Sequence, residues 1–378
     1  MKLLLSKTKI FIFTLLIIAF FIPCLELLIG LFSPIDDIRK SSFIFHNQVK
    51  EFHPYTKVYK PNQKWVLRSE WRPEGDKYFS PDDNIKFFTD EKSYISTSFN
   101  YERKGLENKI IFVGGSTTEC NEVDEEFRFP FLVGKILGDQ YSLFYDTLNY
   151  GVRGHTTQDS INLLMYYHRY EYPQYIVLMH NINDLSWLKN NLTYKFYPPE
   201  SSFKLQLLDL IEYFRFRSNI VFLINSFLID VGIANKRFPG DHRPTVDVAI
   251  ELERQKARFS KKQFLTNIKS LFEKNLNLFV EICRIHGINA ILMTQPTGKD
   301  DHDHVVFNES IRGVAKKFNV PLIDLDKLIK GDRSRLFYPD NIHLNNEGSI
   351  QVATKISQEL AKIISDYTNF SKTNQREE

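Results

Sequence analysis

The chain has 378 residues, of which 43% are hydrophobic and 25% are charged. This composition is ordinary for one large or two average globular domains, and it excludes a disordered chain, a collagen-like repeat and a multi-span membrane protein. The 49 basic and 46 acidic residues leave a net charge of +3, so we expect no nucleic-acid partner. The three cysteines are too few for a disulfide framework and lack the spacing of metal ligands.

The amino terminus carries a long apolar run, residues 10–32, which is enough to cross a hydrocarbon layer of roughly 30 Å. Lysines precede the run and Asp36 and Asp37 follow it, which places the short tail in the cytoplasm and the remainder outside. A cleaved signal peptide is the alternative, but its apolar region is normally about 7–15 residues and ends at a small-residue cleavage site. We therefore predict an uncleaved membrane anchor within residues 1–33 and an extracytoplasmic domain.

Residues 34–105 show no sustained periodicity, and their proline-containing segments indicate extended or turn structure. We interpret this region as a connector lying against the main domain or as a small β module.

From about residue 106 to 368 the pattern is α/β, because short continuous apolar runs alternate with helical stretches. Such alternation predicts a parallel sheet covered on both faces, with the carboxyl ends of its strands at one edge. The clearest helix stops at Gly287, as a helix with a glycine at its carboxyl end does. The predicted strands are 110–113, 145–150, 175–179, 288–293 and 320–324, and the predicted helices are 267–286, 310–318 and 350–364.

An insertion at about 187–262 interrupts the alternation and contains a hydrophobic stretch, 205–228, that we predict to be helical. It is either a cap over a functional site or a peripheral addition that packs on the domain. Residues 369–378 are a polar tail.

Gly114-Gly115-Ser116-Thr117-Thr118 directly follows the first predicted strand. Two glycines allow a sharp turn and a close approach to a ligand, and Ser116 then begins a helix with its N–H at the positive end. This geometry suits a nucleophile next to an oxyanion, although an ordinary turn has the same composition. The segment is not a phosphate-binding loop, since the Gly-x-x-x-x-Gly-Lys pattern is absent.

Three later segments also carry polar residues after strands or before the last helix. One is the glycine-rich loop 149–156, and another is 181–184, which also fits a helix cap. The third contains Asp340 and His343. An Asp three residues before a His can hold the imidazole Nδ1 and leave Nε2 free to act as a base.

Taken together, these motifs resemble those of the SGNH hydrolases, also called GDSL-type esterases, over about residues 109–365. The segment Gly114 to Thr118 is similar to the family's first block, with Gly-Gly-Ser in place of Gly-Asp-Ser, a common variant among its extracytoplasmic members. Gly154 matches the glycine of the second block. Asn183 matches the asparagine of the third block, although Asn181 replaces the glycine that usually stands two positions earlier.

Asp340 and His343 match the family's Asp-x-x-His. The resemblance implies a three-layer α/β/α fold around a five-stranded parallel, flavodoxin-like sheet. It also implies that Ser116 is the nucleophile, His343 the base and Asp340 the residue that orients it. The N–H groups of Ser116 and Gly154 and the side-chain amide of Asn183 would form the oxyanion hole. The family's reaction requires neither a metal nor a cofactor.

These observations predict a membrane-anchored, extracytoplasmic serine esterase that removes acyl groups, such as acetyl, from a cell-envelope carbohydrate or lipid. One alternative is an O-acyltransferase that modifies an exopolysaccharide or cell-wall glycan. Another is a non-catalytic, glycan-binding protein of the envelope. We assign no proton-transfer role to His155 or His180, and we interpret the polar run 300–304 as a solvated loop rather than a metal site.

Overall fold

The computed structural model describes residues 21, 24–25, 49–52, 56–67, 85–97, 107–167, 173–194, 259–299 and 301–374. Almost all of them belong to one compact unit, residues 49–196 and 246–378. The predicted membrane anchor lies almost wholly outside the described residues, and so does the helix predicted at 205–228. Among the helices that are described, none is both long enough and apolar enough to cross a membrane.

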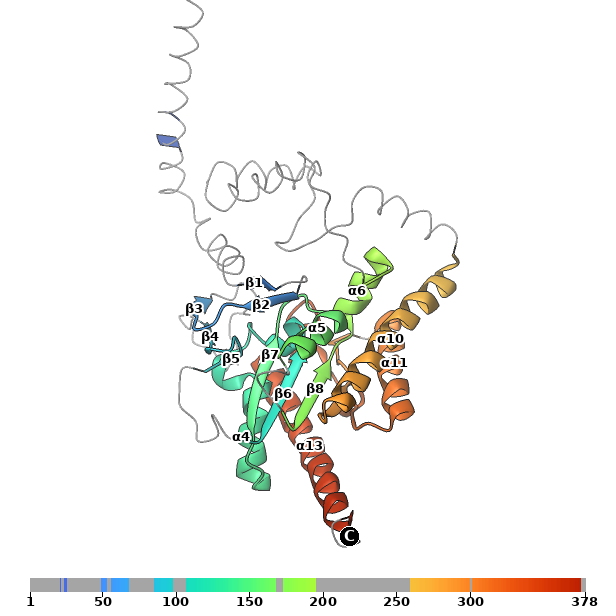
Figure 1. Ribbon diagram of the computed structural model, residues 1–378. Coiled ribbons are helices and arrows are strands. Elements are labelled where there is room, and N and C mark those ends of the chain that lie inside the picture. The colour runs from blue at the N-terminus through green and yellow to red at the C-terminus, as the bar shows by residue number, and fades with distance from the viewer. Residues whose placement is uncertain are drawn as a thin grey trace, which may run out of the picture. The chain divides into compact units, whose positions relative to one another are not determined.

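Five parallel strands lie side by side in the sheet, and three of them, β6, β7 and β8, are labelled in Figure 1. Their order is β10-β9-β8-β6-β7, so the chain starts inside the sheet and moves outward in both directions, as in flavodoxin-like folds. Every residue of β8 is buried, as expected for a parallel strand covered on both faces. The bounds are β6 Lys109–Gly114, β7 Asp146–Gly151, β8 Tyr175–Met179, β9 Asn289–Met293 and β10 Leu322–Ile323.

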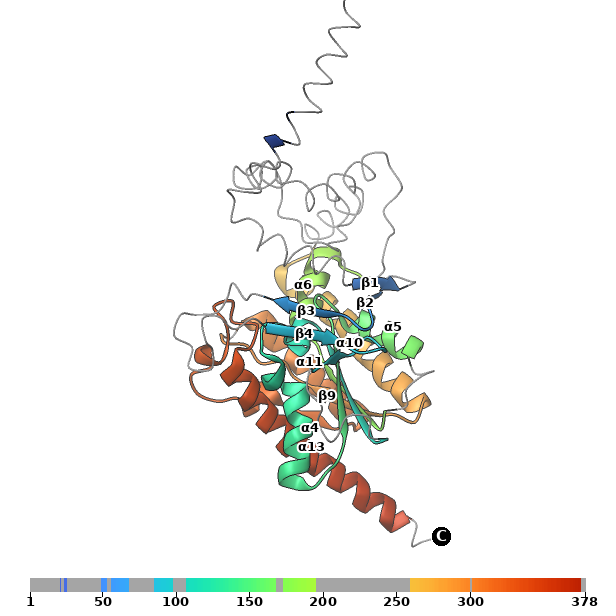
Figure 2. The same cartoon turned by 90° about the vertical axis from the view of Figure 1, so that its left-hand side faces the viewer.

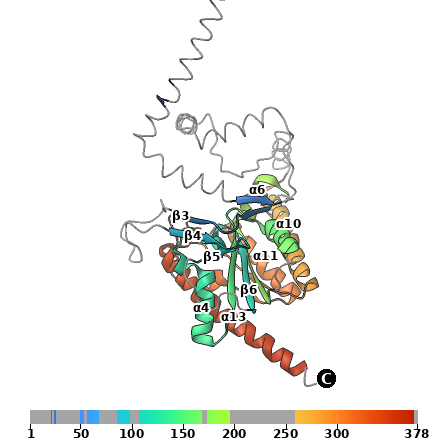
Figure 3. The ribbon, with the colours of Figure 1, turned by 60° about the vertical axis from the view of Figure 1, so that its left-hand side comes forward.

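The prediction of a purely parallel, five-stranded sheet is wrong, because three antiparallel strands continue the sheet beyond β7 (Figure 3). They come from the region interpreted as a connector or a small β module: β3 Lys64–Leu67, β4 Ile85–Thr89 and β5 Ile95–Ser96. The result is a mixed sheet of eight strands. These strands are short, so their apolar alternation is too brief to identify them in the sequence. A separate antiparallel pair precedes them, β1 Val49–Phe52 and β2 Thr56–Tyr59.

Helices cover both faces of the sheet and enclose two hydrophobic clusters, which gives the predicted three-layer arrangement (Figure 2). One face carries α5 Thr157–Tyr167, α6 Ile182–Asn191, α10 Lys261–Ile285 and α11 His302–Phe318. The other carries α4 Phe129–Tyr141, α12 Leu325–Leu328 and α13 Asn346–Asn374. Shorter helices are α3 Ser116–Glu119 and the 3-10 turns η1 Glu125–Phe127 and η2 Ser334–Leu336.

The helix boundaries differ from the predicted ones where capping side chains act. Asp301 accepts a hydrogen bond from the backbone N–H of Asp303 at 2.9 Å and starts α11 at His302. The interpretation of residues 300–304 as a solvated loop is therefore wrong for most of that run. At the end of α10, Gly287 has φ of +67°, which confirms the predicted glycine stop. Helix α13 continues to Asn374, into the segment expected to be a polar tail.

Candidate active site

The predicted site segments lie at one edge of the sheet because the parallel strands end in register. Gly114 of β6 pairs with Gly151 of β7 and with Met179 of β8, and Met179 pairs with Met293 of β9. The residues that follow these strands therefore emerge side by side. This edge is where open α/β sheets hold their ligands.

Helix α3, which begins at Ser116, lies directly on the ends of the strands. A β-carbon on Gly151 would be 2.2 Å from the backbone N of Glu119, and one on Gly114 would be 2.6 Å from the carbonyl oxygen of Met179. Only glycine allows backbones to approach this closely. The two glycines thus place Ser116 at the sheet edge.

Ser116, His343 and Asp340 form a continuous chain of hydrogen-bonded side chains. The Oγ of Ser116 lies 2.8 Å from Nε2 of His343, across 227 positions in the sequence. The Nδ1 of His343 lies 2.5 Å from Oδ2 of Asp340. The His343 side chain is 26% exposed, so a substrate in solution can reach the imidazole. A serine, a neutral imidazole and a carboxylate in this order can activate the serine hydroxyl for nucleophilic attack.

The Asp340 carboxylate is held in its ionised form. Burial alone would raise the pKa of Asp340, but hydrogen bonds from the His343 imidazole and from the backbone N–H groups of Ile342 and His343 outweigh it, and the pKa lies below its ordinary value. An ionised carboxylate at this position keeps the proton on Nδ1 and leaves Nε2 to accept the serine proton.

Asn183 and Gly154 lie at the same place. The side-chain amide of Asn183 donates a hydrogen bond to the carbonyl oxygen of His155 at 2.9 Å, which uses one of its two N–H groups. Gly154 has φ of +79°, and a β-carbon there would meet open space. The loop that carries Gly154 is tied to β6 by a hydrogen bond from the Val152 N–H to the Gly114 carbonyl oxygen at 3.1 Å. The structure therefore brings together all five residues predicted for the site.

Asn181, which replaces the family's usual glycine, needs no glycine-like backbone, since its φ is −165°. Its side-chain amide donates to the carbonyl oxygen of His304 at 2.9 Å and to Oδ1 of Asn308 at 2.8 Å. The asparagine therefore attaches the start of α6 to α11.

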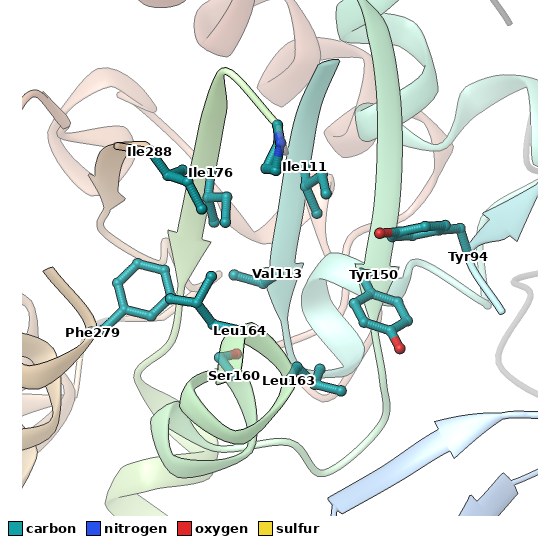
Figure 4. Close-up of a pocket in the computed structure, with 11 residues that line it drawn as sticks. Tyr94, Ile111, Val113, Tyr150, Ser160, Leu163, Leu164, Ile176, Phe279 and Ile288 are labelled. Carbon is teal, nitrogen blue, oxygen red and sulfur yellow. The ribbon is translucent and has the colours of Figure 1, made fainter. Parts of the chain in front are cut away.

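Ser160, His180 and Asp184 form a second Ser-His-Asp set. The Oγ of Ser160 is 2.7 Å from Nε2 of His180, and Nδ1 of His180 is 3.6 Å from the nearer carboxylate oxygen of Asp184. All three side chains are at most 2% exposed. Ser160 also borders a small apolar cavity with Ile111 and Val113 (Figure 4).

Electrostatics makes this second set inert. Burial, with a further contribution from the neighbouring His155, lowers the pKa of His180 to about 3, so its imidazole cannot take a proton near neutral pH. Burial raises the pKa of Asp184 to about 7, although Thr157 and Tyr194 donate hydrogen bonds to it. The pair of His180 and Asp184 is therefore not an ion pair at acid pH, and the distance between them exceeds that of a good hydrogen bond. Of the two sets, only the one with Ser116 has the exposure and the base that nucleophilic catalysis requires.

Asp184 has a structural role that the sequence did not reveal. Its carboxylate accepts hydrogen bonds from the backbone N–H of Thr157 at 3.0 Å, from the Thr157 hydroxyl at 2.6 Å and from the Tyr194 hydroxyl at 2.5 Å. Thr157 is the first residue of α5, so Asp184 caps a neighbouring helix rather than its own. The sequence gives no sign of this pairing, because the two residues lie on different helices.

Among the described residues, no group of three or more His, Cys, Asp or Glu side chains has the arrangement of a metal site. The acidic run at the start of α11 is used otherwise, since Asp303 forms an ion pair with Lys189 at 2.8 Å.

Comparison with known proteins identifies the family of this chain. A sequence model of the GDSL-like lipase/acylhydrolase family matches residues 112–349. Solved structures with a similar fold include TesA, at 14% identity, a TM-score of 0.41, and coverage of 67% of this chain and 98% of that one. Another is LAE5, described as an alpha/beta hydrolase from the metagenome of Lake Arreo, Spain, at 14% identity and a TM-score of 0.41, with coverage of 67% and 94%.

A third is a catalytic mutant of Axe2, an acetylxylan esterase from Geobacillus stearothermophilus, at 14% identity and a TM-score of 0.39, with coverage of 68% of this chain and 95% of that one. A search of curated proteins returned no significant match. Because all three TM-scores are below 0.5, the assignment rests on the family match, which spans more than half of the chain. The chain is a serine hydrolase that acts on ester bonds, and it belongs to the GDSL-like lipase/acylhydrolase family.

Proposed function

We propose that Ser116, His343 and Asp340 carry out ester hydrolysis through an acyl-enzyme. The Ser116 Oγ bonds to the carbonyl carbon of the ester while its proton moves to Nε2 of His343, 2.8 Å away. The imidazolium then returns the proton to the alcohol oxygen, which leaves. Water attacks the acyl-enzyme as it loses a proton to the same nitrogen, and the acid departs with Ser116 regenerated. The observation that carries this proposal is the continuous Ser116–His343–Asp340 contact.

The charge that develops on the carbonyl oxygen is stabilised by the N–H groups of Ser116 and Gly154 and by the second N–H of the Asn183 amide. The support is geometric: the Asn183 amide is fixed by its bond to His155, and Gly154 lies one residue before that acceptor. Donors that are fixed before the reaction stabilise an oxyanion most effectively, and one of them is typically worth about 2.7–4 kcal/mol of barrier.

We further propose that the substrate is an acylated carbohydrate or lipid of the cell envelope, with acetyl as the acyl group. The support is the expected placement of the domain outside the membrane, held by the apolar run 10–32. A reporter that works only outside the cytoplasm, fused after Glu378, should be active. Activity of a cytoplasm-only reporter there would contradict the placement, and a mature protein that starts beyond residue 25 would remove the anchor.

A fluorophosphonate probe tests the nucleophile, because only an activated serine hydroxyl reacts with it. We expect one covalent adduct, on Ser116, located by peptide mass spectrometry. Ser116→Ala should abolish labelling, whereas Ser160→Ala should leave it unchanged, since the second set is buried and its base is not protonatable near neutral pH. An adduct on Ser160, or none on a folded protein, would contradict the assignment.

Two assays on one acetylated glycan separate the hydrolase from the alternatives. An esterase releases acetate in water, whereas an acyltransferase acetylates the bare glycan only when a donor ester is supplied. The same acyl-enzyme serves both reactions, because the first half-reaction is identical. The two reactions differ only in the acceptor of the acyl group, which is water for the esterase and a glycan hydroxyl for the acyltransferase. Glycan binding that Ser116→Ala leaves intact, with neither activity present, would support the binding protein.

A further inference from the structure

Gly154, whose N–H is one of the proposed oxyanion donors, lies in a tight turn. The N–H of His155 donates to the carbonyl oxygen of Val152 at 3.0 Å and closes the turn 152–155. Gly154 is the third residue of this turn, and its φ of +79° is the value that a type II turn requires there. The N–H of Gly154 therefore belongs to the central peptide unit of the turn, the one between Arg153 and Gly154.

The hydrogen bond that closes the turn does not fix the direction of this central peptide unit. Type I and type II turns share that bond and differ in the orientation of the central peptide, and glycine at the third position can adopt both. A rotation of the peptide unit would point the Gly154 N–H away from the oxyanion while the turn stayed closed. A donor at this place therefore needs a second constraint.

The side chain of Arg153 supplies a constraint of this kind. Its Nη2 donates a hydrogen bond to Oε1 of Glu122 at 2.9 Å. This ion pair joins the turn 152–155 to the loop 120–124, which follows the helix that begins at Ser116. The two side chains are 42% and 21% exposed, and an ion pair on the surface adds little to the stability of a fold. Its main effect is therefore on the orientation of the turn.

The loop 120–124 is itself fixed by hydrogen bonds to two other segments. The hydroxyl of Tyr338, a residue that is 2% exposed, donates to the carbonyl oxygen of Glu122 at 2.9 Å. At the end of the loop, the N–H of Asp124 donates to Oδ1 of Asn346 at 3.3 Å, and the amide of Asn346 donates to Oδ2 of Asp124 at 3.1 Å. Glu122 therefore stands on a backbone that is held in place.

We propose that Arg153 is a positioning residue of the active site, whose ion pair with Glu122 fixes the central peptide of the turn and so directs the Gly154 N–H at the oxyanion. Tyr338 extends the connection to the base, since its own N–H donates to the carbonyl oxygen of His343 at 2.8 Å. The inference rests on the oxyanion hole given under the proposed function. Arg153 acts through the backbone of Gly154 rather than on the reacting atoms.

Arg153→Gln, made in the full chain and assayed on a short acyl ester, tests the proposal. We expect kcat to fall about tenfold with KM nearly unchanged, because about one molecule in ten then holds the donor in the reactive direction and kcat scales with that fraction. The urea midpoint should not move, since the ion pair is exposed. Inhibition by phenylboronic acid should weaken by the same factor as kcat, because its tetrahedral adduct with Ser116 resembles the transition state.

Glu122→Gln should reproduce these losses. The double variant of Arg153→Gln and Glu122→Gln should lose no more than either single variant, since each of the three lacks the same interaction. Lys189→Gln is the matched control: Lys189 of α6 pairs with Asp303 of α11 at 2.8 Å, and the side chains are 38% and 17% exposed. This ion pair has a similar length and exposure, and its loss should leave kcat unchanged.

Three results would overturn the proposal: an unchanged kcat in Arg153→Gln, a fall in kcat with an equally lowered urea midpoint, or losses that multiply in the double variant. If Glu122→Gln does not fold, Arg153→Gln decides alone. Fluorophosphonate labelling of Ser116 and a lowered kcat in Asn183→Ala test the proposed function separately. If either is absent, the proposed function fails and this inference with it, whereas if both are present only this inference is at stake.

Discussion

A β-carbon on Gly115 would lie 2.1 Å from Nδ2 of Asn183, so the Asn183 amide occupies the space that any other residue at position 115 would fill. The same amide donates to the carbonyl oxygen of His155. Gly115, which precedes Ser116, and His155, which follows Gly154, therefore hold the Asn183 amide between them. In this chain the contact therefore favours glycine at position 115.

The first prediction concerns Asn183 itself. Asn183→Ala should lower kcat about 10²–10³-fold and leave KM nearly unchanged, because the donor acts mainly on the transition state. Steady-state kinetics on a short acyl ester provides the measurement. Asn190→Ala, an exposed asparagine on the same helix, is the control and should behave like the unaltered enzyme. An unchanged kcat with the chemical step rate-limiting would remove Asn183 from the oxyanion hole.

The second prediction follows from the contact between Gly115 and Asn183. Gly115→Ala should displace the amide and reduce kcat toward the level of Asn183→Ala. The double variant should lose little more than either single variant, since both changes remove one interaction and their effects are not additive. If kcat of the double variant falls by the product of the two single losses, Gly115 acts independently of Asn183.

Asp340→Asn gives the third prediction. The amide cannot hold the Nδ1 proton, so kcat should fall by about 10⁴ with the fold intact. Because the folded pKa of Asp340 is below its ordinary value of 3.8, this group stabilises the fold above that pH and loses its contribution only as the pH falls through the folded pKa. The difference in urea midpoint between the enzyme and the variant should therefore shrink in strong acid. A difference in urea midpoint that stays the same at every pH would contradict this prediction.

Asp184 should give the opposite pH dependence, which is the fourth prediction. Its pKa is raised from 3.8 to about 7 in the folded protein, so between these values the folded chain holds a proton that the unfolded chain has lost. Its contribution to stability is complete below pH 4 and is lost as the pH rises through about 7. Asp184→Asn should flatten this part of the curve of unfolding free energy against pH. If the substitution leaves the slope of unfolding free energy against pH unchanged, a group other than Asp184 binds this proton.

The fifth prediction separates backbone strain from catalysis. Gly154 and Gly287 have φ of +79° and +67°, and a β-carbon on either would meet open space. Alanine at either position should destabilise the fold by about 1–2 kcal/mol, the cost of a left-handed conformation. Only Gly154→Ala should also lower kcat, by up to about 10²-fold, because a donor displaced by about 1 Å stabilises the oxyanion poorly. Equal activity of the two variants would exclude the Gly154 N–H from the site.

Much of the site follows from the sequence because its parts are local or are aligned by a regular sheet. Asp340 and His343 are three residues apart, so their contact needs only one turn of loop. Ser116 lies 227 residues away from His343, yet its place after a buried strand assigns it to the same sheet edge. The continuous apolar run of β8 likewise indicates, by its residue types alone, a strand that is buried on both faces.

The tertiary structure decided what depends on pairing between distant segments. The two residues of β5 carry no recognisable period, and they become a strand only by pairing with β4 and β7. Tyr59 reaches Glu119 across 60 positions, which no spacing in the sequence indicates. Such contacts depend on how the added strands pack, and packing is a property of the whole chain.

The two Ser-His-Asp sets show the same division most clearly. Ser116 with His343, and Ser160 with His180, are the same residue types at hydrogen-bond distance, 2.8 Å and 2.7 Å. The sequence by itself determined the turn after a buried strand and the Asp-x-x-His pair that mark the first set. Only the folded structure decided that the second set is inert, because burial removes water from His180 and so prevents its imidazole from accepting a proton.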